Sequence, residues 1–91
     1  MDAVDRINEL LQLEGISRPQ LAEKTGMKKE RWQNVLKRTS KLYQEDLEAL
    51  YAVFPEYAVW LATGMEFPEK GQLSPITKKA HAVSKTAPRA G

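Results

Sequence analysis

The chain has 91 residues and a mass of 10.3 kDa, enough for one small domain. It has no cysteine and one histidine, which excludes a disulfide framework, a thiolate zinc site, a cysteine nucleophile and a histidine-rich metal cluster. The chain opens on acidic residues, and its longest apolar run is far below the roughly 20 residues of a membrane helix. We therefore expect a cytoplasmic protein with no membrane segment, cofactor or metal.

The net charge of +2 is unevenly distributed along the chain. Residues 18–41 carry eight basic residues against two acidic ones, a net charge of +6. The flanking segments are acidic: residues 1–17 have one basic residue against four acidic ones, and residues 42–73 have one against six. Residues 74–91 add four basic residues. This pattern is typical of a domain that presents one face to a polyanion, and equally of a solvated surface whose charges cluster by chance.

Three helices are predicted in the first 40 residues. Apolar residues at three- and four-residue intervals predict a helix over 3–14, which Gly15 ends. Ser17 and Gln20 have the spacing of a capping box, so a second helix runs from there to Thr25. Gly26 breaks that helix, and a third follows over 29–37. A connection of three or four residues between two short helices is typical of a helix-turn-helix.

Two further helices are predicted before the composition changes. Apolar residues from Leu47 to Phe54 indicate a fourth helix that Pro55 stops, and a fifth follows to Gly64. No strand pattern is present, so we expect an all-α fold of five helices. Residues 1–66 form the domain, with the helix-turn-helix at about 17–37. Residues 67–91 are rich in Pro, Gly and Lys, and we expect an extended or disordered basic tail with little order beyond about residue 75.

The segment from Pro19 to Leu36 meets several structural constraints within a short stretch. Ala22 is small where the third helix crosses the second, and Gly26 allows the positive φ of a tight turn. The apolar residues Leu21, Met27, Trp32, Val35 and Leu36 fill the space between these helices and their neighbours. Trp32 is expected in the core, as are Tyr51 and Phe54.

With these residues the sequence resembles the helix-turn-helix of the phage repressor family, the Cro/cI or Xre-like proteins. The matching positions are Leu21-Ala22, Gly26-Met27, Trp32 and Val35. The resemblance covers about residues 3–64, and the segments 55–64 and 68–75 also look like small phage or prophage regulators. One departure is Lys28, where the family often has a Ser or Thr cap. The resemblance implies a compact lambda-repressor-like domain whose third helix lies in the major groove while the second crosses the DNA backbone.

A helical projection at about 100° per residue assigns contacts to double-stranded DNA. With Trp32, Val35 and Leu36 inward, the outward positions are polar and long. Asn34 and Gln33 have the groups to pair with adenine, Lys29 and Lys37 with guanine, and Glu30 with a cytosine amine. The flanking residues are expected at phosphates: Arg18, Gln20, Lys28, Arg31, Arg38 and Lys41.

The aromatic side of the fifth helix has two interpretations. Tyr57, Trp60 and Leu61 either cover the core or form a homodimer contact, as the corresponding region often does in the resembled family. A homodimer would match a two-fold operator, with half-sites about one turn apart. His81 lies in the predicted tail, where we expect no ligand or catalytic role.

No arrangement for enzymatic chemistry is present, because the sequence lacks an acid and base pair, an activated nucleophile, a phosphate-binding glycine loop and a metal constellation. We interpret the acidic residues of the fourth helix, Glu45, Asp46 and Glu48, as its solvated face. The function predicted is a sequence-specific transcriptional regulator, most simply a phage or prophage repressor, whose activity depends on concentration, competition or a regulatory protein partner. The alternative is an antitoxin or adaptor that binds a protein partner with its fourth and fifth helices.

Overall fold

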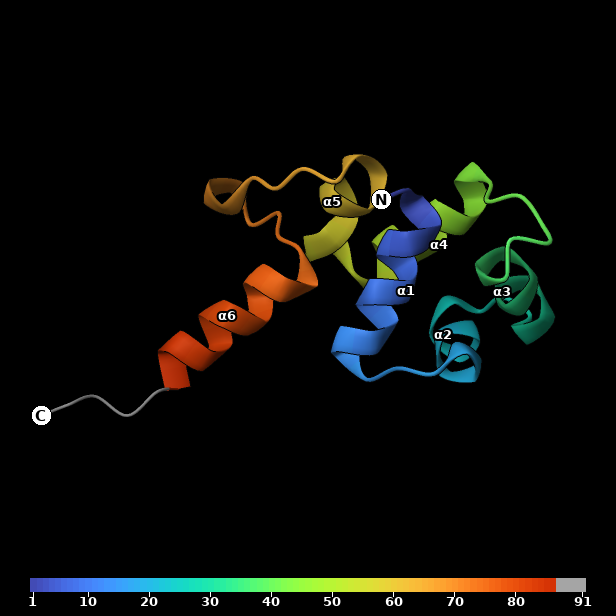
Figure 1. Ribbon diagram of the computed structural model, residues 1–91, viewed down its shortest axis with the longest axis horizontal. Helices are drawn as coiled ribbons and strands as arrows, with labels where there is room; N and C mark the ends of the chain where they lie inside the picture. Colours follow the sequence, from blue (N-terminus) through green and yellow to red (C-terminus); the bar gives the residue numbers. More distant parts are fainter. Residues whose placement is uncertain (87–91) are drawn as a thin grey trace, which may run out of the picture.

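The computed structural model describes the backbone of residues 1–86 and the side chains of residues 1–81 (Figure 1). The first three helices are α1 (Ala3–Glu14), α2 (Arg18–Thr25) and α3 (Lys29–Leu36). They are followed by α4 (Gln44–Val53), the 3-10 helix η1 (Pro55–Tyr57) and α5 (Ala58–Thr63). The 3-10 helix η2 (Pro68–Lys70) and the helix α6 (Pro75–Thr86) complete the described part, which holds no strand beyond a single bridge between Phe67 and Gln72.

The helix ends lie close to their predicted positions because local groups fix them. Asp2 and Ser17 each close a capping box at the start of α1 and α2, as the Ser17–Gln20 spacing predicts. Gly26, at φ +73°, ends α2 in the left-handed conformation, and the Met27 amide donates to the Ala22 carbonyl oxygen at 3.1 Å. The predicted sharp bend between α2 and α3 is therefore confirmed. Lys28 occupies the N-cap of α3 without a side-chain cap.

The core joins α1 to α5 in a single cluster. It contains Leu10 from α1, Leu21 from α2, Trp32 from α3, Leu50 from α4 and Leu61 from α5, each fully buried. The predicted core roles of Trp32, Val35, Leu36 and Phe54 are confirmed, and Tyr51 and Met27 pack against the cluster from half-buried positions. At about 25 cal/mol per Å² of apolar surface, such burial is the main stabilising force in a chain without disulfides.

The segment after α5 differs from the extended or disordered tail expected for residues 67–91. Ser74 caps α6 by accepting from the Thr77 amide at 3.2 Å, and Pro75 takes the first helical position and is fully buried. Gln72 accepts from the Val59 amide at 3.0 Å and donates to the Pro55 carbonyl oxygen at 3.0 Å. Composition gives no sign of such long-range bonds, which make this segment ordered. Residues 87–91 of the predicted tail lie outside the described residues.

The helix-turn-helix and α6 lie at opposite ends of the molecule, with α1 between them (Figure 1). This arrangement keeps the outer side of α3 clear of the C-terminal segment. None of the helices in the described part is long and apolar enough to span a bilayer.

Candidate nucleic-acid interface

The outer face of α3 carries most of the predicted base-contacting residues. Lys29, Glu30, Asn34 and Lys37 are exposed, and Gln33 is half-buried. On the opposite face, Trp32, Val35 and Leu36 are buried. The helical projection therefore gives the correct inner and outer sides of α3.

Trp32 fixes the distance between α2 and α3. Its indole Nε1 donates to the Thr25 Oγ1 at 2.9 Å, and that hydroxyl donates to the Leu21 carbonyl oxygen at 2.8 Å. The ring is fully buried, so its one polar atom needs this partner. The sequence gives Thr25 no distinct signal, because the bond depends on how α3 crosses the end of α2.

The C-terminal end of α3 is closed by backbone bonds around Arg38. The Thr39 amide donates to the Asn34 carbonyl oxygen at 2.9 Å, and the Arg38 amide donates to the Val35 carbonyl oxygen at 3.1 Å. This Schellman arrangement requires the left-handed conformation at position 38. Arg38 adopts it, at φ +67°, although it is not a glycine. Arg38 is therefore held in a conformation that strains its backbone.

The guanidinium of Arg38 is paired with acids of α1, where we expected a phosphate contact. It donates to Asp2 at 2.7 and 3.1 Å and to Asp5 at 2.8 Å. The hydrogen bond from Arg38, with a second from the Asp5 amide, holds the pKa of Asp2 well below its ordinary value. This contact links the end of α3 to the start of α1.

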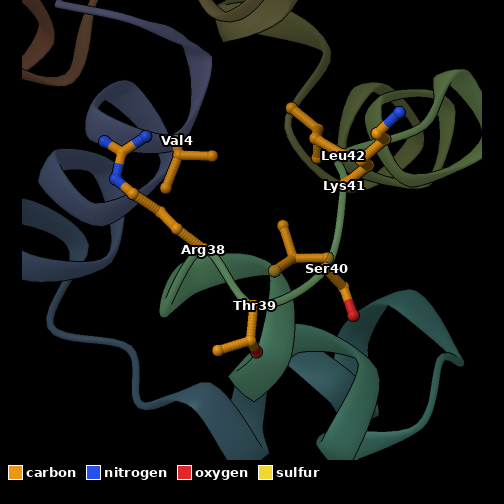
Figure 2. Close-up of a pocket in the computed structure, with 7 residues that line it drawn as sticks. Val4, Arg38, Thr39, Ser40, Lys41 and Leu42 are labelled. Atoms are coloured by element: carbon orange, nitrogen blue, oxygen red, sulfur yellow. The ribbon is translucent and has the colours of Figure 1, made fainter.

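A groove of about 300 Å³ lies beside this link, between the first turn of α1 and the loop after α3. Figure 2 shows Arg38 reaching along it toward α1, on the side of Val4. Residues Thr39, Ser40, Lys41 and Leu42 form the loop side. On this loop side, Thr39 and Lys41 are exposed.

Arg31, the second expected phosphate ligand, is also paired. Its Nε donates to Asp46 Oδ1 at 3.1 Å, and its Nη2 donates to Asp46 Oδ2 and, at 2.8 Å, to the Lys41 carbonyl oxygen. Asp46 is only 2% exposed, so the prediction that it lies on the solvated face of the fourth helix is wrong. The hydrogen bonds that Arg31 donates to the Asp46 carboxylate raise the pKa of Arg31, whose charge is thereby neutralised within the fold.

The remaining cations of the basic segment are exposed, except for the half-buried Arg18. Within the residues whose side chains are described, Arg18, Lys24, Lys28, Lys29, Lys37 and Lys41 form no ion pair. Gln20 is exposed at the start of α2, but its Oε1 already accepts from the Ser17 amide at 2.8 Å. This leaves its amide nitrogen as the donor for a phosphate.

One solved structure is similar over most of this chain. It is Pf6r from the filamentous phage Pf6 of Pseudomonas aeruginosa PA01, with 32% sequence identity and a TM-score of 0.69. The match covers 84% of this chain and 97% of that chain. The chain belongs to the family of Pf6r. Comparison with protein-family models and with curated proteins finds no match.

In this member of the Pf6r family, the three residues considered for a dimer contact lie in the core. Tyr57 is 1% exposed, Trp60 6% and Leu61 0%. Burial, together with the hydrogen bond to Glu14 at 2.6 Å, raises the pKa of Tyr57. Of the two interpretations of α5, the structure supports core packing.

Three acids near α3 have roles that the sequence does not reveal. Asp2 and Asp5 have the spacing of a capping box, which they form, but nothing local indicates that they also bind Arg38. Asp46 is three residues after Tyr43, whose amide donates to its Oδ2 at 2.8 Å. Tyr43 is not a residue type that usually caps a helix, so this spacing does not stand out in the sequence.

Proposed function

We propose that the protein is a sequence-specific DNA-binding regulator of phage or prophage transcription. The observation that carries this proposal is the geometry of α3, in which a fully buried Trp32 opposes an outer row of Glu30, Asn34 and Lys37, and Lys29 is exposed in the first turn. These side chains carry the donors and acceptors that distinguish base pairs in the major groove. Membership of the family of Pf6r, a filamentous phage protein, supports the phage context.

The distribution of charge supports DNA as the partner. Six cations of α2, α3 and the loops next to them form no ion pair in the described part, whereas most acidic residues belong to α1, α4 and the segment after α5. Cations around α3 would contact phosphates and fix the register of the outer row on the duplex. Apart from Asp5 and Asp46, which pair with Arg38 and Arg31, the acids of these elements would repel the DNA elsewhere and favour this one orientation.

The alternative of a protein-gripping antitoxin or adaptor has less support. Most apolar side chains of α4 and α5 are buried in the core or pack against it. The large exposed hydrophobic residues of the described part are Met1, Tyr43, Met65 and Ile76. These four belong to separate segments and do not form a row along one helix. A protein interface usually has a buried apolar centre, for which α4 and α5 leave little surface.

Selection of bound DNA from a random pool, with the mass of the protein in solution measured alongside, tests the proposal. We expect an enriched palindrome with half-sites about one helical turn apart, and a doubled mass. Affinity for the selected duplex should fall with salt at a slope of about −0.9 per phosphate neutralised. A pool without enrichment, or binding that salt does not weaken, would contradict the proposal and favour a protein partner.

A further inference from the structure

A partly buried ion pair connects α3 to α4, and the proposed DNA contacts do not use it. The Asp46 carboxylate accepts from Arg31 Nε at 3.1 Å, from Arg31 Nη2 and from the Tyr43 amide at 2.8 Å. It is 2% exposed, and burial of a carboxylate is costly unless it is paired and hydrogen-bonded. Both of its oxygens are satisfied within the chain.

Arg31 gathers three segments around this carboxylate. Its Nη2 also donates to the Lys41 carbonyl oxygen at 2.8 Å, and its guanidinium lies 5.1 Å from the centre of the Tyr43 ring. One side chain of α3 is therefore bound to the first turn of α4 and to the loop between them. The planar guanidinium fixes direction as well as distance, because two of its nitrogens meet two carboxylate oxygens.

The place of Arg31 on α3 determines what this contact controls. It directly follows Glu30 and precedes Asn34 by three residues, so it lies on the flank of the proposed base-contacting row. A rotation of α3 about its axis would pull the guanidinium away from Asp46 and from the Lys41 carbonyl oxygen. The contact therefore opposes the movement that would turn the outer side chains away from the base edges.

We propose that Arg31 is a positioning residue that acts through Asp46 to set the rotation of α3, and that it is not a phosphate ligand. This inference rests on the proposed function. The two roles make opposite predictions for Asp46→Asn. Loss of an acid that neutralises Arg31 would strengthen binding to all DNA if Arg31 were available for phosphate. If Arg31 positions α3, the same change weakens binding to the selected sequence.

The test compares the parent protein with Asp46→Asn and Arg31→Lys on the selected duplex and on a random duplex, across a salt series. We expect the ratio of the two affinities to fall about tenfold or more in both variants, since small displacements of a contacting group have large effects. The salt slope on the random duplex should stay unchanged, because no phosphate contact is lost. Glu48→Gln, at an exposed acid of the same helix, serves as the control for charge and should keep the parent's ratio.

Removal of one partner from a buried pair can unfold a small domain, so the double variant Arg31→Gln with Asp46→Asn is measured as well. Its two substitutions together leave the net charge unchanged, and we expect the same fall in the ratio of the two affinities. Tighter binding by Asp46→Asn with the ratio retained, or a salt slope reduced by about one in Arg31→Lys, would overturn the positioning role. A parent protein that selects no sequence would instead overturn the proposed function.

Discussion

At the residue scale, the helical projection correctly predicts which side chains of α3 face outward, but not that two flanking arginines are paired within the chain. Arg31 and Arg38 lie at the flanks of α3, as predicted, and both are engaged by carboxylates of the same chain. Asp46 is 15 residues from Arg31, and Asp2 is 36 residues from Arg38. Local periodicity carries no information on such partners, because they come together only through the packing of α1 and α4 against α3.

The left-handed conformation of Arg38 gives a prediction on stability. Arg38→Gly and Arg38→Ala both remove the ion pairs with Asp2 and Asp5, but only glycine adopts φ +67° without strain. We expect the glycine variant to melt at a higher temperature than the alanine variant, as followed by circular dichroism. Equal melting temperatures would mean that this backbone position is not strained.

The contact between Asp2 and Arg38 also gives a prediction on pH. The folded pKa of Asp2 lies below the value of about 3.9 in an unfolded chain, since Arg38 stabilises the charged form. Its contribution is therefore fully present above about pH 4 and is lost as the pH falls toward the folded pKa. The urea midpoints of the parent and of Asp2→Asn should converge below about pH 4. A difference between them that does not change with pH would contradict this assignment.

At the scale of the elements, α1 to α5 could be predicted closely because local groups define their ends. The capping box of Ser17, the left-handed Gly26 and the Pro55 stop are all visible in the sequence. Helix α6 could not be predicted, since its order depends on contacts with distant residues. Lys78, for example, pairs with Glu56 at 2.7 Å and lies 5.4 Å from the centre of the Tyr57 ring.

The cap of α6 can be tested by Ser74→Ala. Ser74 is buried, and its Oγ accepts from the Thr77 amide at 3.2 Å, so the substitution leaves the helix start unsatisfied. We expect a loss of about 1 kcal/mol, visible as faster hydrogen exchange in α6. Ser40→Ala is the matched control, because the Ser40 hydroxyl makes no hydrogen bond in the described part of the chain. Unchanged exchange in the Ser74 variant would show that the cap does not hold α6.

At the scale of the whole molecule, the division of charge along the chain has a structural counterpart. The basic segment contains α2, α3 and the loop after them, at the end of the molecule away from α6 (Figure 1). Three acids nevertheless form ion pairs within this region. Asp46 pairs with Arg31, and Asp2 and Asp5 at the start of α1 pair with Arg38. Counting charge along the sequence therefore overstates the cations available to a partner by two, Arg31 and Arg38.

The central claim is that the outer row of α3 contacts base edges. Its most direct test is the affinity of Asn34→Ala for the selected operator and for each single base-pair variant of it, with Lys41→Ala measured alongside. We predict that Asn34→Ala loses about 1–3 kcal/mol on the operator and no longer discriminates at one position of each half-site. Lys41→Ala should weaken binding to every duplex alike. An Asn34→Ala protein that binds the operator and all its variants as the parent does would contradict the claim.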